Sequence, residues 1–127
     1  MPDSEKKVIL AVDDMNEVLI SINEILGDMY DVRLVKNAAA GLGLLNKEKV
    51  DLVLLDIEMP EISGIDILRD IRHNPALKTL PIVFITSNAN KIIVHQAVSM
   101  GIAGYITKPF AADKLQAKVA EVLEAAK

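Results

Sequence analysis

The chain has 127 residues, of which 51% are hydrophobic and 25% charged, with a net charge of −4 and no cysteine. This composition is typical of one globular domain, and the lack of cysteine excludes disulfides, thiolate metal sites and thiol catalysis. The acidic balance argues against nucleic-acid binding, which needs clustered Lys and Arg, and the apolar runs are too short to span a membrane. Residues 1–7 lack the hydrophobic region of a signal peptide, so we expect a cytoplasmic protein that contacts neither nucleic acid nor membrane directly.

Strand and helix patterns alternate along the whole chain. In chain order they predict strands at residues 8–12, 30–35, 50–56, 82–85 and 105–107, separated by helices at residues 15–26, 38–47, 65–73 and 91–100, with a last helix that includes residues 115–123. The strand at 50–56 is apolar at four consecutive positions, Leu52–Leu55, as expected of a central parallel strand covered on both faces. This alternation predicts an α/β fold, a doubly wound five-stranded parallel sheet with five helices in a single domain.

The helix at 38–47 contains a Gly-x-Gly sequence, Gly41 and Gly43. Phosphate-binding loops place such glycines in the turn after a strand, whereas these two lie inside a helical pattern that Asn37 can cap. Each glycine weakens a helix by about 1 kcal/mol relative to alanine. We interpret the pair as packing residues.

Polar residues stand where four of the predicted strands end. Asp13 and Asp14 follow the first strand, Asp56 ends the third, Thr86 follows the fourth and Lys108 follows the fifth. Parallel strands bring these ends to one edge. If the strand order is 2-1-3-4-5, the first and third strands are neighbours and the three carboxylates converge. Like charges at such a distance need a cation, and an all-oxygen site suits Mg²⁺. With an ammonium and a hydroxyl beside it, this edge is suited to holding a phosphoryl group on a carboxylate.

These residues resemble the receiver domain of bacterial two-component response regulators, and the resemblance covers essentially all of residues 1–127. It rests on Asp13-Asp14, on Asp56 with Met59-Pro60 and Gly64 behind it, on Thr86, and on Tyr105 before Lys108-Pro109-Phe110. Each element alone is weak, but all of them in order at the strand ends are specific. The resemblance implies a flavodoxin-like fold like that of chemotaxis regulators. It also implies a phosphoacceptor in a phosphorelay rather than an enzyme.

The resemblance implies a role for each polar position. Asp56 is expected to take a phosphoryl group from the phosphohistidine of a histidine kinase or phosphotransfer protein. Asp14 is expected to bind Mg²⁺, or Mn²⁺ in its place, directly, and Asp13 through water; Asp56 and the backbone carbonyl of Glu58 complete this site. Lys108 is expected to pair with Asp56 before transfer and with a phosphoryl oxygen afterwards. The acidic pair is also placed to cap the first helix, which is compatible with metal binding.

The resemblance further implies a switch formed by Thr86 and Tyr105, and a cis bond between Lys108 and Pro109. Phosphorylation draws the Thr86 hydroxyl inward and frees space for Tyr105, which shifts the balance between two packings of the domain. Residues 92–94 are three successive apolar residues that cannot all face the core. We therefore expect the face formed by residues 91–126 to bind a downstream effector or a second copy of the chain.

Other functions stay open at this stage. A pseudo-receiver would keep the fold as a scaffold without phosphorylation, although the complete polar set argues against it. A haloacid-dehalogenase-like phosphatase also uses an aspartate nucleophile, but it needs a second aspartate two residues on, where this chain has Glu58, and a larger chain with a substrate cap. Asp56 could also simply end a strand, and Tyr105 could be an ordinary half-buried aromatic residue of an edge strand.

Overall fold

The computed structural model of the protein describes residues 6–57, 64–87, 95, 96 and 98–126. The elements in chain order are β1 (Val8–Val12), α1 (Asn16–Leu26), β2 (Asp31–Val35), α2 (Ala38–Lys47), β3 (Leu52–Asp56), α3 (Gly64–His73), β4 (Ile82–Thr86), β5 (Gly104–Thr107) and α5 (Ala112–Ala125). The strands form one parallel sheet in the order β2-β1-β3-β4-β5. The predicted α/β class and strand order are therefore confirmed.

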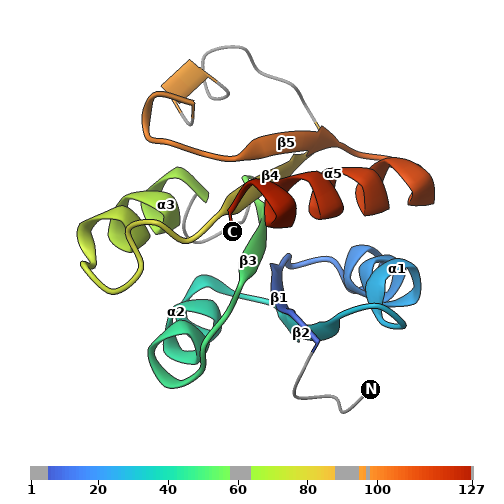
Figure 1. Ribbon diagram of the computed structural model, residues 1–127, viewed down its shortest axis with the longest axis horizontal. Coiled ribbons are helices and arrows are strands. Elements are labelled where there is room, and N and C mark those ends of the chain that lie inside the picture. Colours follow the sequence, from blue (N-terminus) through green and yellow to red (C-terminus); the bar gives the residue numbers. More distant parts are fainter. Residues whose placement is uncertain (1–5, 58–63, 88–94, 97, 127) are drawn as a thin grey trace.

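Helices cover both faces of this sheet, with α2 and α3 on one side and α1 and α5 on the other (Figure 1). Five helices were predicted, and four are described as whole elements. Half of the predicted helix at 91–100 lies outside the described residues, and residues 95, 96, 98 and 99 are helical. The apolar residues 92–94 also lie outside them. Gly101, which follows this segment, has a φ of +88°, a left-handed conformation that glycine adopts without a steric penalty.

The hydrophobic core consists of two clusters, one on each face of the sheet, because successive side chains of a strand point to opposite faces. The first cluster joins α2 and α3 to the sheet and includes Leu10, Leu45, Val53, Leu55, Leu68, Ile71 and Phe84. The second joins α1 and α5 to the other face and includes Ile9, Leu19, Ile22, Leu54, Val83, Leu115 and Val119. Every residue of β3 and β4 is buried, as expected for parallel strands covered on both faces. This packing fixes the carboxyl ends of the central strands.

Asn37 is the N-cap of helix α2: its side-chain oxygen accepts a hydrogen bond from the backbone N–H of Ala40 at 2.8 Å, so the predicted cap is confirmed. The two glycines of this helix have different surroundings. A Cβ atom on Gly41 would lie 3.2 Å from Cγ2 of Val12 in β1, whereas a Cβ on Gly43 would meet no described atom within 4 Å. The interpretation as packing residues is confirmed for Gly41 and is wrong for Gly43.

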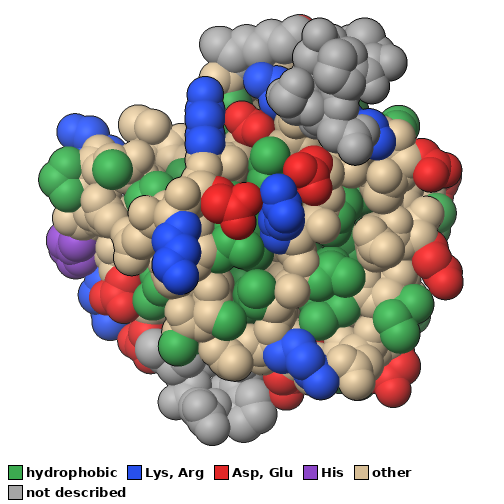
Figure 2. All heavy atoms as spheres, turned by 90° about the horizontal axis from the view of Figure 1, so that it is seen from below, with side chains coloured by type: hydrophobic (Ala, Val, Ile, Leu, Met, Phe, Trp, Pro, Cys, Tyr) green, Lys and Arg blue, Asp and Glu red, His purple; other side chains and the backbone are tan. Residues whose placement is uncertain are grey.

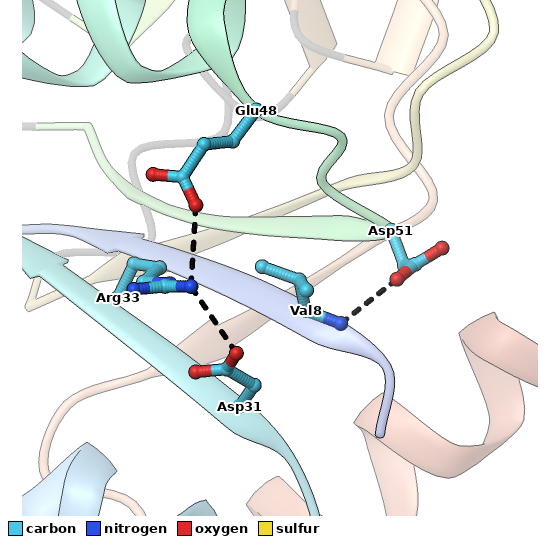
Figure 3. Close-up of polar contacts among 5 residues, drawn as sticks. All are labelled: Val8, Asp31, Arg33, Glu48 and Asp51. Atoms are coloured by element: carbon cyan, nitrogen blue, oxygen red, sulfur yellow. Dashed lines mark hydrogen bonds and ion pairs between the residues drawn. The ribbon is translucent and has the colours of Figure 1, made fainter. Parts of the chain in front are cut away.

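Strand β2 is an edge strand of the sheet, and its charged residues are paired (Figure 3). Nη2 of Arg33 lies 3.2 Å from a carboxylate oxygen of Asp31 and 3.2 Å from one of Glu48, the residue that ends α2. At the start of β1, the N–H of Val8 donates to the carboxylate of Asp51 at 2.8 Å. Charged side chains along an exposed strand edge disfavour pairing with other strands.

The surface that faces downward in Figure 1 carries side chains of every chemical type. Figure 2 shows acidic, basic and hydrophobic side chains interspersed over the side that faces downward in Figure 1. Within the described residues, no helix combines the length and the hydrophobicity that crossing a membrane requires.

Candidate functional site

The predicted polar residues lie together at the carboxyl-terminal edge of the sheet. The pairing register aligns Val12 with Leu55, Asp56 with Ile85, and Thr86 with Thr107. Neighbouring strands therefore end side by side. The polar residues at or just after these strand ends are Asp13, Asp14, Asp56, Thr86 and Lys108. Glu58, whose backbone carbonyl was predicted as a further metal ligand, lies outside the described residues.

Three carboxylates converge at this edge, as the strand order predicted. Asp13, Asp14 and Asp56 each offer an oxygen, and these three atoms lie within 4.8 Å of one another. Asp13 and Asp56 are 1% and 3% exposed, so water screens their charges poorly. Buried like charges at this separation are unfavourable unless a cation joins them.

Lys108 supplies one positive charge to this cluster. Its Nζ lies 2.8 Å from Oδ2 of Asp13 and 3.6 Å from Oδ2 of Asp56. The family resemblance implied a pair with Asp56, yet the nearer partner is Asp13. The backbone holds this lysine in place, because the N–H of Lys108 donates to the carbonyl of Thr86 at 2.7 Å. The bond between Lys108 and Pro109 is cis, as predicted.

Asp13 uses its two carboxylate oxygens differently. Oδ1 accepts a hydrogen bond from the N–H of Met15 at 2.9 Å. Met15 is the N-cap residue of α1 and has no side-chain cap, so the carboxylate stabilises the turn before the helix instead of capping the helix itself. Oδ2 is buried beside Lys108 and has no hydrogen bond of regular geometry among the described residues.

This donor set fits a hard divalent cation. The converging side chains of Asp13, Asp14 and Asp56 all offer oxygen, which Mg²⁺ and Mn²⁺ prefer. The buried Oδ2 of Asp13 still has capacity to accept a ligand bond. Asp14, which the resemblance implied as the direct ligand, is the more exposed member of the adjacent pair. It is therefore reachable by a hydrated ion that retains several waters.

The two residues predicted as a switch differ sharply in exposure. Thr86, at the end of β4, is fully buried, whereas Tyr105 on β5 is 45% exposed. Tyr105 pairs with Phe84, two positions before Thr86 on the adjacent strand. The aromatic ring is thus at the surface while the threonine lies at the edge that carries the carboxylates.

Comparison with known proteins agrees with this arrangement. Residues 9–120 match the family model of the response regulator receiver domain. The chain belongs to that family. It is 34% identical over 118 residues to Chemotaxis protein CheY-3 of Vibrio cholerae, with 91% of each chain covered. It is also 31% identical over 119 residues to a probable cyclic di-GMP phosphodiesterase of Vibrio cholerae; this match covers 94% of the present chain but only 27% of that relative.

Solved structures agree with the sequence relatives. The receiver domain protein (CheY-like) of Methanospirillum hungatei superposes with a TM-score of 0.89 at 28% identity, covering 96% of this chain and 97% of that one. This chain is therefore a receiver domain of a two-component system, a class that works with kinase or phosphotransfer partners and with effectors. Receiver domains typically bind Mg²⁺ in an acidic pocket, and the converging aspartates form such a pocket.

Proposed function

We propose that this receiver domain accepts a phosphoryl group on Asp56 from a phosphohistidine and uses the phosphorylated state to change a partner-binding face. The observation that carries the proposal is the convergence of three aspartates and one lysine at the carboxyl-terminal edge. Carboxylates and an ammonium lie close together here with little water between them. Such a site suits a reaction that delivers a doubly negative phosphoryl group and retains it.

The transfer step is a displacement at phosphorus. A carboxylate oxygen of Asp56 forms the new bond to phosphorus, the bond between phosphorus and the imidazole nitrogen breaks, and the donor histidine leaves with that electron pair. Asp56 is 3% exposed and ends a fully buried strand, so its carboxylate is held in position. Holding the nucleophile in this way lowers the entropic cost of reaching an in-line geometry.

The metal site belongs to the same proposal. Asp13, Asp14 and Asp56 would hold the cation, with the backbone carbonyl of Glu58 as the further ligand implied by the family. When bound, Mg²⁺ neutralises charge on the phosphoryl oxygens. These carboxylates, at the ends of the adjacent strands β1 and β3, would hold the cation beside the phosphoryl group.

Lys108 would change partners during the reaction. Before transfer its ammonium is shared between Asp13 and Asp56. After transfer a phosphoryl oxygen on Asp56 is the stronger acceptor, because it carries more charge than the carboxylate oxygen it replaces. The pairing with Asp13 means that Lys108 already lies within the cluster when the phosphoryl group arrives.

The switch would run from Thr86 to Tyr105. The Thr86 hydroxyl donates a hydrogen bond to the new phosphoryl group, and Tyr105 turns from its exposed position into the space this movement frees. A hollow of about 690 Å³ beside β5 and α5 supports this face as the partner surface, and its lining includes Tyr105, Pro109, Phe110, Lys114 and Lys118. A rotation of Tyr105 changes the shape of this hollow directly.

The proposed partners are a histidine kinase or phosphotransfer protein as donor and, on the face of residues 91–126, a downstream effector or a second copy of the chain. The likeness to a chemotaxis protein over 91% of both chains supports a signalling role. We propose that the domain works in the cytoplasm as a phosphoacceptor, assisting only its own phosphorylation and dephosphorylation. A pseudo-receiver scaffold is the alternative that the test below separates from it.

The test is intact-mass spectrometry after incubation with acetyl phosphate and Mg²⁺, beside an Asp56→Asn control. We expect one added phosphoryl group that requires Mg²⁺ and is absent from the control. A folded wild-type protein that gains no mass from acetyl phosphate is then incubated with a phosphorylated histidine protein. No adduct from either donor would overturn the proposal and leave the scaffold.

A further inference from the structure

Arg72 connects three segments of the chain at the edge of the sheet opposite the aspartates. It lies in the last turn of α3, and its Nη1 donates to the carbonyls of Lys78 at 3.2 Å and Leu80 at 2.8 Å. Its Nη2 donates to the carbonyl of Gly101 at 2.7 Å. The first two carbonyls precede β4 and the third precedes β5. Figure 1 shows the end of α3 and the turn before β5 on the same, left-hand side of the molecule.

The guanidinium bonds to backbone rather than to acid. Burial lowers the pKa of Arg72 by desolvation, and in the described part of the chain no carboxylate forms an ion pair with it. The two terminal nitrogens of its planar guanidinium instead donate to carbonyls of different segments. A lysine ammonium lacks this geometry. Such charge-assisted bonds are stronger than neutral ones, so the carbonyl of Gly101 is held firmly to α3.

Strand β5 depends on this connection more than the interior strands do. It is an edge strand of four residues, paired within the described sheet only with β4, and Ile106 is its one buried residue. At its start, the N–H of Ala103 donates to the carbonyl of Ile82 at 2.8 Å. At its end, the N–H of Lys108 donates to the carbonyl of Thr86. Little hydrophobic burial holds the strand between these two points.

We propose that Arg72 is a positioning residue for the switch strand: by holding the carbonyl of Gly101, it fixes the start of β5 and with it the resting position of Tyr105. The proposal rests on the proposed function of Tyr105 as a switch. Without the Arg72 guanidinium the amino-terminal half of β5 is free to move, while the carboxylates that follow β1 and end β3 keep their places. Arg72 also lines an open hollow of about 500 Å³, so water can reach the released carbonyls and the variant is expected to fold.

Three variants test this role. Arg72→Gln removes the guanidinium, and Arg72→Lys keeps the charge without the planar geometry. Arg69→Gln is the matched control, because Arg69 lies on the same helix, is exposed and, among the described residues, pairs only with Asp66 on the surface at 3.1 Å. Far-UV circular dichroism checks that each variant is folded, and Arg72→Lys carries the test if Arg72→Gln does not fold.

Amide hydrogen exchange by NMR measures the connection itself. We expect the Ala103 amide to exchange at least about tenfold faster in Arg72→Gln, less so in Arg72→Lys, and at the wild-type rate in Arg69→Gln. The amide of Asp13, which donates to the carbonyl of Val35 at 3.1 Å directly after β1, serves as an internal reference. Equal Ala103 rates in Arg72→Gln and Arg69→Gln would overturn the proposal. Equal acceleration at Ala103 and Asp13 would also overturn it, because it indicates a global loss of stability.

Tyrosine fluorescence measures the consequence for the switch. The chain has two tyrosines and no tryptophan, so in a Tyr30→Phe background the signal reports Tyr105 with and without beryllofluoride and Mg²⁺. We expect the Tyr105 fluorescence of Arg72→Gln without beryllofluoride to be intermediate between that of the wild type without beryllofluoride and that of the wild type with it. A responsive wild type with an unchanged Arg72→Gln baseline overturns the positioning role. A wild type that does not respond overturns the switch instead, and the exchange rates still decide whether Arg72 positions β5.

Discussion

Replacing Lys108 with methionine tests the electrostatics of the site most directly. The ammonium lies 2.8 Å from Asp13 and 3.6 Å from Asp56. At an effective dielectric constant of about 20, each contact is worth roughly 5–6 kcal/mol of attraction. Desolvation offsets much of this, and removing one member of a buried pair costs about 3–5 kcal/mol because the remaining charge is left uncompensated. We expect Lys108→Met to lose that much stability when no metal is present.

Urea unfolding in EDTA measures the loss of stability without metal, and urea unfolding in Mg²⁺ measures how much stability the ion restores. Because Lys108 and a cation compete for the same carboxylates, the variant should bind Mg²⁺ about tenfold more tightly or better and regain much of its lost stability when the ion is added. Lys49→Met is the control, since Lys49 is exposed and precedes β3 at the opposite edge. Equal stability of the two variants in EDTA, or an equal gain from Mg²⁺ in Lys108→Met and the wild type, would refute the reasoning.

Three further outcomes are expected. Gly43→Ala should raise the free energy of unfolding by about 1 kcal/mol, because the site is open and alanine favours helix; Gly41→Ala should show no such gain, because its methyl group crowds β1, and urea midpoints compare the two. Asn37→Ala should lower stability by roughly 0.5–2 kcal/mol through loss of the cap of α2, also read from urea midpoints. Thr86→Val keeps the buried shape without the hydroxyl, so mass spectrometry should still detect phosphorylation of Asp56 while Tyr105 fluorescence no longer responds; a normal response would contradict the switch.

The site was largely predictable because its residues follow strands. A parallel sheet brings the carboxyl ends of its strands to one edge, so the positions of Asp13, Asp56 and Lys108 in the sequence already implied that they meet. The contact between Lys108 and Asp13 was not predictable, because it depends on how side chains share a space of a few ångströms. The resemblance pointed to Asp56 as the partner of Lys108, and the geometry favours Asp13.

The sequence by itself determined the class of fold and the helix cap at Asn37, since apolar periodicity and capping are local properties of the chain. The strand order came from the family resemblance, because periodicity does not choose between the possible orders of a doubly wound sheet. Only the tertiary structure decided which glycine of α2 lies against β1, because that depends on the approach of a distant strand. The tertiary structure alone also revealed the contacts of Arg72, which donates hydrogen bonds to backbone carbonyls up to 29 residues away in the sequence. Every residue has such a carbonyl, so no pattern of side chains could indicate which ones an arginine would reach.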